Sequence, residues 1–181
     1  MDALQIFTVG HSNRSAEEFT DLLRAHEIAQ VADVRTVPKS SHNPQFWGAA
    51  LEASLAAAGI DYRWFPQLGG LRKTRADSPN GAWRNASFRG YADYMLTPEF
   101  AAGLAELLDY AAQAPTAIMC AEAVPWRCHR SLIGDALLLQ GHEVYDIMSP
   151  TKATPEKLTS FAVVTDGVLT YPPDDGAETR A

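Results

Sequence analysis

The sequence predicts an α/β protein: a single three-layer α/β/α domain built around a mostly parallel sheet of about five strands. Short apolar segments alternate with helical segments through the first 150 residues, which is the pattern of βαβ units. The length of 181 residues suits one domain with a substantial core, and a content of 46% hydrophobic and 20% charged residues is ordinary for a globular protein.

The first half of the chain supplies three strands and two helices. Ser15 and Glu18 match a capping box, in which hydroxyl and carboxylate each accept from the other residue's backbone N–H, so a helix begins there. An alanine-rich helix covers residues 46–58 and ends at Gly59. The long loop over residues 66–87 is of a kind that is usually functional in a compact domain. The strands are expected at residues 6–9, 30–34 and 61–65.

The second half is expected to add two strands and further helices. Thr97, Pro98 and Glu99 have the order of an N-cap, a first-turn proline and a first-turn acid, so they begin a helix that extends to about Ala111. The other expected elements are a short helical piece at residues 91–95, a strand at 116–119, a helix at 130–140 and a strand at 143–148.

We expect residues 1–150 to form the α/β domain and residues 151–171 to form a C-terminal extension that packs on it. Within the extension, Thr154-Pro155-Glu156 predicts the start of a short helix, and two apolar segments around Asp166-Gly167 predict a hairpin. Residues 172–181 are proline-led and acidic, which predicts a disordered tail.

Bulk composition predicts a cytoplasmic protein without a membrane partner. No apolar run approaches the roughly 20 residues that span a bilayer, the N-terminus lacks the features of a signal peptide, and the two cysteines favour free thiols. The net charge of −7 argues against bulk binding of nucleic acid. Six basic residues against one acidic residue between Arg63 and Arg89 nevertheless indicate either a local anion site or solvated loop charge.

Chemically capable residues gather in the loops that follow the strands. Right-handed crossovers place these loops at one edge of a parallel sheet, and that edge is where open α/β sheets bind ligands. The candidates are His11, Ser12 and Asn13 after the first strand, Asp33 and Arg35 after the second, Arg89 and Tyr91 after the long loop, and Cys120, Glu122, Cys128, His129 and Arg130 after the fourth strand.

Cys120 is the candidate nucleophile, because a cysteine at a strand end, close to a helix N-terminus and to arginines, favours its thiolate. His129 is then the candidate base, and Glu122 an acid, a base or an orienting group. His11 is a further catalytic candidate. The alternatives are that Cys120 is a small buried strand residue and that His11 is a hydrogen-bonded core histidine.

Several residue types suited to anions are present. Arg35 can grip a phosphate or carboxylate, or it can form an ion pair with Asp33. Arg89 and Tyr91 combine a cation with an aromatic ring, which suits stacking on a base, although helix packing would look the same. The glycine fingerprint of nicotinamide-binding folds is absent, so that cofactor is not expected. The anion-binding candidates are Ser12, Asn13, Asp33, Arg35, Arg89, Tyr91 and Arg130.

A bound transition metal is an alternative use of the same atoms. Cys120, Cys128 and His129 could supply thiolate and imidazole ligands. Their spacing matches no known zinc pattern, and neighbours on a helix diverge by about 100°. One metal could therefore use both Cys128 and His129 only if they precede the helix.

The motifs together resemble a family known as domain of unknown function 488. The resemblance extends from about Phe7 to Ile147 and is specific in the order and spacing of its motifs. It implies a single α/β domain with one shared site, and it implies no substrate. The segments that carry it are Gly10-His11-Ser12, Asp33-Val34-Arg35, Pro44-Gln45-Phe46, Leu68-Gly69-Gly70, Arg89-Gly90-Tyr91-Ala92-Asp93-Tyr94-Met95, Cys120-Ala121-Glu122 and Cys128-His129-Arg130.

The sequence thus predicts a small enzyme that acts on an anionic, phosphate-bearing substrate, such as a nucleotide or a nucleic-acid end, at the carboxyl edge of the sheet. Two alternatives stay open. A non-catalytic module would bind nucleotides or nucleic acid even after the loss of Cys120, and a Cys/His metalloprotein would lose a stoichiometric metal when Cys128 is replaced.

Overall fold

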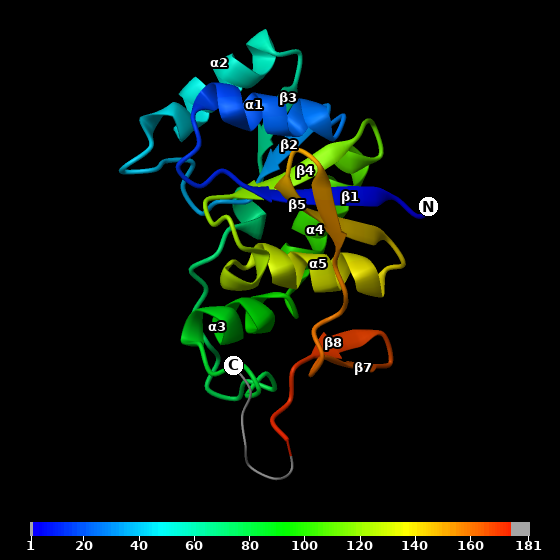
Figure 1. Ribbon diagram of the computed structural model, residues 1–181. Coiled ribbons are helices and arrows are strands. Elements are labelled where there is room, and N and C mark those ends of the chain that lie inside the picture. The colour runs from blue at the N-terminus through cyan, green and yellow to red at the C-terminus, as the bar shows by residue number, and fades with distance from the viewer. Residues whose placement is uncertain (1, 175–181) are drawn as a thin grey trace.

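The computed structural model describes residues 2–174, which form a three-layer α/β/α domain around a six-stranded sheet (Figure 1). The strand order is β3-β2-β4-β1-β5-β6, and all neighbours are parallel except β5 and β6. The strands are β1 (Gln5–Gly10), β2 (Gln30–Asp33), β3 (Asp61–Trp64), β4 (Thr116–Cys120), β5 (Glu143–Ser149) and β6 (Lys152–Pro155). The predicted fold class is confirmed, with one strand more than the five expected.

Helices cover both faces of this sheet, with α1 and α2 on one side and α4 and α5 on the other (Figure 1). Side chains alternate along β4, so Met119 packs toward α1 and α2 while Cys120 belongs to the core on the α5 side. The helices are α1 (Ala16–Ala25), α2 (Gly48–Ala57), α3 (Ala86–Tyr94), α4 (Pro98–Ala111) and α5 (Arg130–Leu139). None of these described helices is both long and apolar enough to cross a membrane.

Local capping explains where the helices begin. Ser15 and Glu18 form the predicted capping box of α1, and Thr97 caps α4 through the backbone N–H of Phe100. Helix α3 begins at Ala86 and is longer than the predicted piece at residues 91–95. The reason is the side chain of Asn85, which accepts hydrogen bonds from two backbone N–H groups of the first turn.

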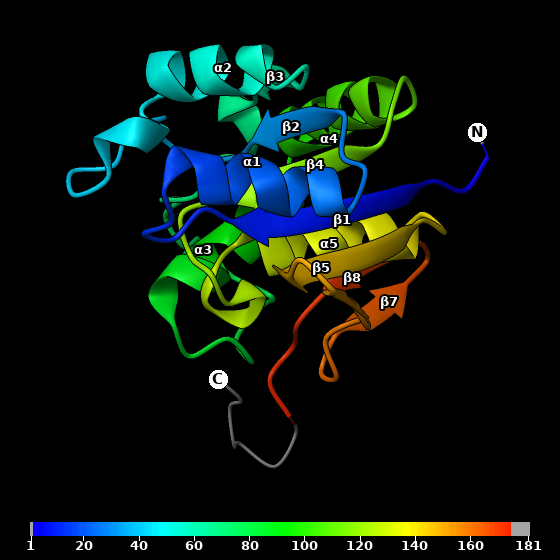
Figure 2. The same ribbon diagram turned by 45° about the horizontal axis from the view of Figure 1, so that its top comes forward.

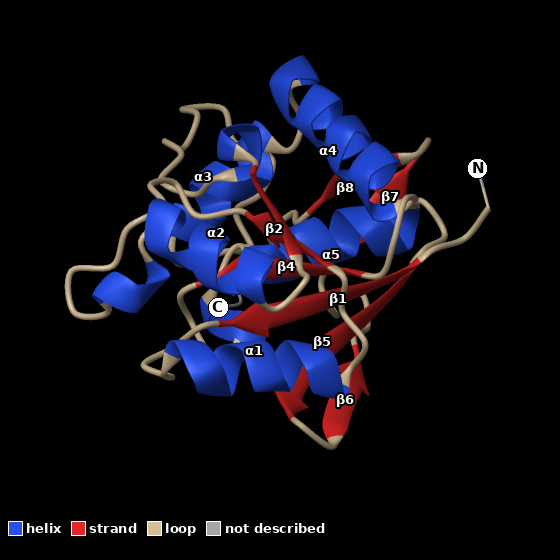
Figure 3. Ribbon diagram, turned by 90° about the horizontal axis from the view of Figure 1, so that it is seen from above, coloured by secondary structure: helices blue, strands red, loops and turns tan. Residues whose placement is uncertain are grey.

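The segment after residue 150 corrects one expectation. The helix predicted to begin at Thr154 is absent, and the same residues form β6, which pairs antiparallel with β5 beside it (Figure 3). The open edge of β5 offers backbone partners that outweigh a local helix-start signal. Residues 175–181, which make up most of the expected disordered tail, lie outside the described residues.

The predicted hairpin is present as β7 (Val163–Thr165) and β8 (Val168–Thr170), and it lies on the α5 side of the molecule (Figure 2). Asp166 and Gly167 both have positive φ, at 51° and 79°, which suits a tight two-residue turn. Just after β8, Tyr171 is buried in the core on that side, so the end of the described chain is anchored to the domain.

Candidate functional site

The loops after β1 and β4 run side by side at the carboxyl edge of the sheet. Gly10 pairs with Cys120, and beyond the strand the backbone N–H of His11 donates to the Cys120 carbonyl at 2.9 Å. A Cβ atom at position 10 would lie 1.7 Å from the carbonyl oxygen of Glu122, so this close approach requires glycine. The loops after β1 and β4 therefore form one continuous surface.

The sulfur of Cys120 is held by two hydrogen-bond donors. Nη1 of Arg130 lies 2.8 Å from Cys120 Sγ, and Sγ of Cys128 lies 2.6 Å from it. Burial opposes ionisation of the Cys120 thiol, but the hydrogen bond from Cys128 and the charge and hydrogen bond of Arg130 together lower its pKa to about 7. These contacts favour the thiolate form of Cys120, although only 2% of its surface is exposed.

The guanidinium of Arg130 is fixed by backbone and side-chain oxygens as well as by the thiolate. Its Nη1 and Nη2 donate to the carbonyls of Glu122 and Ala123, at 2.5 and 3.2 Å, and its Nε donates to Oγ1 of Thr8 at 3.2 Å. The side chain is fully buried. Arg130 is thus a positioning residue that holds the thiolate and the loop after β4, and its hydrogen bonds are taken up within the chain.

Cys128 and His129 form the other side of this cluster. The hydrogen bond to Cys120, burial and the charge of the neighbouring thiolate raise the pKa of Cys128, so Cys128 keeps its proton. Burial lowers the pKa of His129 and outweighs the hydrogen bonds with the carbonyls of Val34 and Leu68, which raise it. His129 Nε2 lies 2.9 Å from the Val34 carbonyl, which can only accept, so we assign the proton of the neutral ring to Nε2. Nδ1 then carries no proton, and it lies 3.6 Å from Cys128 Sγ.

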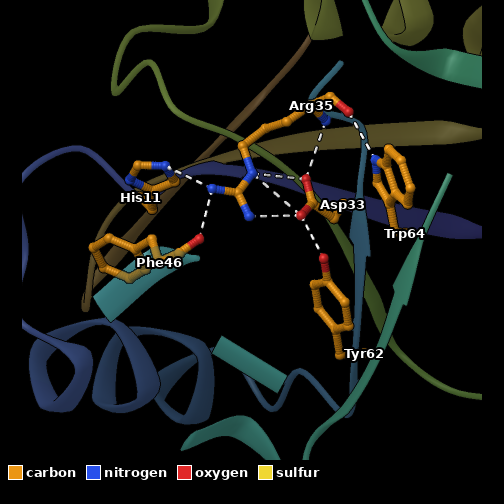
Figure 4. A network of polar contacts seen from close by, with 6 residues as sticks. All are labelled: His11, Asp33, Arg35, Phe46, Tyr62 and Trp64. Carbon is orange, nitrogen blue, oxygen red and sulfur yellow. Dashed lines mark hydrogen bonds and ion pairs between the residues drawn. The ribbon is translucent and has the colours of Figure 1, made fainter. Parts of the chain in front are cut away.

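A second cluster surrounds Arg35 (Figure 4). Arg35 forms a bidentate pair with Asp33, with Nε 3.0 Å from Oδ1 and Nη2 2.7 Å from Oδ2. Its Nη1 donates to the Phe46 carbonyl at 2.7 Å, and Tyr62 donates its hydroxyl to Asp33 at 2.6 Å. Exposure is 5% for Arg35 and 0% for Asp33. Of the two roles left open for Arg35, the ion pair with Asp33 is the one seen in the structure.

His11 belongs to this second cluster (Figure 4). Its Nδ1 lies 2.7 Å from the Ser12 carbonyl, so Nδ1 carries the proton, and Nε2 faces Nη1 of Arg35 at 3.5 Å. Burial lowers the pKa of His11 and favours the neutral ring, which stacks on Phe46 with a centroid distance of 4.3 Å. The imidazole of His11 therefore bridges the loops after β1 and β2.

Comparison with known proteins places both clusters in one family. The family model described as domain of unknown function DUF488 matches residues 15–137, which is more than half of the chain. The chain belongs to the DUF488 family. No curated protein and no solved structure matches it. The DUF488 match includes the Asp33–Arg35 pair and the whole segment from Cys120 to Arg130, so the two buried arginines are parts of the family domain.

Tyr91 of this DUF488 domain lies next to the cysteine cluster. Its ring centroid is 4.9 Å from that of His129, and its hydroxyl donates to the Leu68 carbonyl at 2.8 Å. The side chain is buried. Tyr91 therefore packs behind His129, where it helps to fix the imidazole.

The remaining candidates lie at the periphery. Glu122 has an exposed side chain, and its carbonyl oxygen is the atom that reaches Arg130. Ser12 is half-buried with a positive φ of 51°, and Asn13 is exposed. Arg89 donates to the Trp83 carbonyl at 3.0 Å. The DUF488 fold thus brings Cys120, Cys128, His129 and Arg130 together and leaves the side chains of Glu122 and Arg89 outside that cluster.

Sequence reasoning missed Thr8 and Asp146. Thr8 accepts from Arg130 and donates to Oδ1 of Asp146 at 2.5 Å, so a chain of hydrogen bonds leads from the thiolate to β5. Asp146 in turn lines a cleft of about 530 Å³. The available signal was a polar residue at each of these positions inside strands that are otherwise apolar on the buried face.

Metal binding has no support in the arrangement of potential ligands. Within residues 2–174, no three or more histidine, cysteine or carboxylate side chains are grouped so that they could hold a metal ion. Nε2 of His129 is directed to a carbonyl, and the cysteine sulfurs hydrogen-bond to each other and to Arg130.

Proposed function

We propose that this DUF488 protein is an enzyme that uses the thiolate of Cys120 as its nucleophile. The observation that carries the proposal is the contact of 2.8 Å between Arg130 Nη1 and Cys120 Sγ, inside a site from which water is largely excluded. The thiolate is the nucleophilic form of cysteine, and a fixed guanidinium beside it favours that form near neutral pH.

The roles of the neighbouring groups follow from their geometry. Arg130 stabilises the negative charge on Cys120 before and after reaction, and Cys128 donates a hydrogen bond to the same sulfur. His129 is placed to exchange a proton with Cys128, since its Nδ1 faces that thiol at 3.6 Å. His129 is therefore proposed as the base for Cys128, whereas the sequence suggested it as the base for Cys120.

The substrate is proposed to be small and anionic. A cleft of about 530 Å³ gives room for a small molecule beside the segment that carries Cys128 and Arg130. Its lining includes Trp126, Ser131 and Lys157 as well as the acids Asp146 and Glu156, and neither cysteine lines it. The excess of six basic residues over one acidic residue between Arg63 and Arg89 supports an anion, such as a phosphate ester or a nucleotide.

The rate of alkylation by iodoacetamide as a function of pH tests the nucleophile. Mass spectrometry of peptides would follow Cys120 and Cys128 separately, and Cys128→Ser would confirm the assignment while keeping a hydrogen-bond donor. We expect modification of Cys120 with a midpoint near pH 7, well before Cys128 reacts. A midpoint at the ordinary thiol value of about 8.5, or equal reaction of both cysteines, would contradict the proposal.

A further inference from the structure

The two cysteines of the chain lie in direct contact, although they are eight residues apart in sequence. Both are free thiols, and their Sγ atoms are 2.6 Å apart. Formation of a disulfide bond between them therefore requires only a small local shift. Cys128 lies in extended backbone between the turn Pro125–Arg127 and α5, outside any regular element that would resist such a shift.

The two sulfurs differ in their surroundings in a way that fits two different steps. Cys120 is hydrogen-bonded to the guanidinium of Arg130, which favours a thiolate ready to attack. Cys128 is the protonated partner, and an imidazole nitrogen that can accept its proton lies 3.6 Å away. One sulfur is therefore arranged to react first and the other to follow.

Burial restricts what can reach Cys120. Only 2% of Cys120 and 7% of Cys128 is exposed. A disulfide on a second folded protein cannot reach a sulfur enclosed in this way, whereas small molecules can, and hydrogen peroxide is among the smallest of them. The surroundings of Cys120 thus favour a small-molecule oxidant over a protein disulfide.

We propose that Cys120 and Cys128 are a redox pair that reduces a small hydroperoxide and cycles between dithiol and disulfide. The inference rests on the proposed function, because Cys120 is the nucleophile in both. It adds hydroperoxides as a second class of reactant for the same thiolate, beside the small anionic substrate.

The first step is attack of the Cys120 thiolate on one oxygen of hydrogen peroxide. The S–O bond forms, the O–O bond breaks, the sulfur loses two electrons to become a sulfenic acid, and hydroxide leaves and takes up a proton to become water. Arg130, which is held by the loop carbonyls, stays in place to stabilise the charge that moves from sulfur to oxygen.

In the second step Cys128 attacks the sulfur of Cys120. His129 accepts the proton of Cys128, the S–S bond forms, the S–O bond of the sulfenic acid breaks, and the departing hydroxide takes the proton back from His129 as water. In total, two thiols and one hydrogen peroxide become one disulfide and two water molecules.

Two reducing thiols complete the cycle. The first attacks Cys128, which is the more exposed of the two residues, and forms a mixed disulfide with it while Cys120 leaves as the thiolate that Arg130 stabilises. The second thiol attacks the first one in this mixed disulfide, so that Cys128 leaves as a thiol and the two reducing thiols leave as their own disulfide. A leaving thiol of low pKa departs faster, so the same contact that activates Cys120 for attack also makes the disulfide reducible.

Hydrogen peroxide itself is the probe for the test. One equivalent added to the reduced full-length protein is expected to lower its mass by two hydrogen atoms, with a peptide link between Cys120 and Cys128 that dithiothreitol reverses. Cys128→Ser is expected to form no disulfide and to stop at a sulfenic acid that dimedone traps. His129→Asn is expected to accumulate the same sulfenic acid, because closure is slowed while the first step is not.

Two results would overturn the redox inference while leaving the nucleophile intact. One is that both thiols survive excess peroxide although iodoacetamide still modifies Cys120 near pH 7. The other is a disulfide that joins two protein molecules, seen as a dimer without reductant. If Cys120 reacts with neither reagent near pH 7, the proposed function fails as well.

Discussion

Two arginines are buried at the same edge of the sheet and have different partners. Arg35 holds the carboxylate of Asp33 through two of its nitrogens, and Arg130 holds the sulfur of Cys120. Both also donate to backbone carbonyls: Arg35 to that of Phe46, and Arg130 to those of Glu122 and Ala123. Arg130 donates in addition to the hydroxyl of Thr8. The two guanidiniums are thus fixed by the same means.

The difference lies in the chemistry of the anion. A carboxylate that accepts from Arg35 and from Tyr62 is a stable end state, so that cluster fastens the second loop to the sheet. A thiolate keeps its nucleophilicity when an arginine stabilises it. A buried arginine at the carboxyl edge of the sheet thus becomes a chemical feature only when its partner can react.

Breaking the Arg35 pair is expected to have the largest effect. Arg35→Met would leave the Asp33 carboxylate fully buried without a cation, and losses of this kind are about 3–5 kcal/mol in the free energy of unfolding. Denaturant titration would measure it. Arg63→Met is the matched control, because the pair of Arg63 with Glu106 is roughly half exposed and should contribute under about 1 kcal/mol. Equal losses for the two variants would contradict the structural role of Arg35.

Tyr62→Phe is expected to have the next largest effect. It removes the hydroxyl that donates to Asp33 at 2.6 Å and should lower the free energy of unfolding by about 2 kcal/mol, as for other hydrogen bonds to charged groups. The alkylation midpoint of Cys120 should not move, because Tyr62 belongs to the other cluster. A changed midpoint in this variant would show that the two clusters are coupled.

Replacement of Arg130 by methionine tests the cluster around the two cysteines. Arg130 favours the charged form of Cys120, so its loss raises the thiol pKa, and a rise of one unit from about 7 lowers the thiolate fraction at pH 7, and with it the alkylation rate, by about fivefold. We expect at least one such unit, measured as the pH midpoint of alkylation in the folded variant. Arg75→Met, at an exposed ion pair with Asp77, is the control that should leave the midpoint at wild-type pH. An unshifted midpoint in the Arg130 variant would remove Arg130 from the mechanism.

Glu156 extends the comparison beyond Arg130 and gives a prediction of direction alone. Burial and the neighbouring Asp146 raise the pKa of Glu156. Because the folded state favours the protonated acid, its stabilising contribution is complete below the unfolded pKa of about 4.5 and is lost as the pH rises through the raised pKa of the folded state. Glu156→Gln should therefore flatten the decrease in Tm as the pH rises from 5 to 9. Parallel Tm curves for the two proteins would argue against a neutral Glu156.

The sequence alone predicted the alternation of strands and helices, the caps at Ser15 and Thr97, and the hairpin at Asp166-Gly167, because each depends on residues close in the chain. It could not predict β6, whose existence depends on an edge of β5 left open by the sheet. For the same reason the sequence could not decide whether Arg35 binds a ligand or pairs with Asp33. The pair with Asp33 is held by Phe46 and Tyr62, which reach it from other elements.

In the cysteine cluster, the sequence indicated which residues would meet but not how they would share protons. Cys120 and Cys128 were separate candidates, and only the packing of the loop shows their sulfurs in contact. The assignment of His129 to Cys128 depends on the Val34 carbonyl, which fixes the ring from β2. Thr8 was hidden inside a short apolar strand, although a hydroxyl there was itself a signal.

The central place of β1 has a consequence for how the protein is made. This strand is synthesised before its hydrogen-bonding partners β4 and β5, and Phe7 pairs with Ala117. At about 5–20 residues per second, several seconds pass between the synthesis of β1 and that of both neighbours. During that interval an apolar strand with two unsatisfied edges is exposed in the nascent chain, and the sheet can close only after β5 has been synthesised.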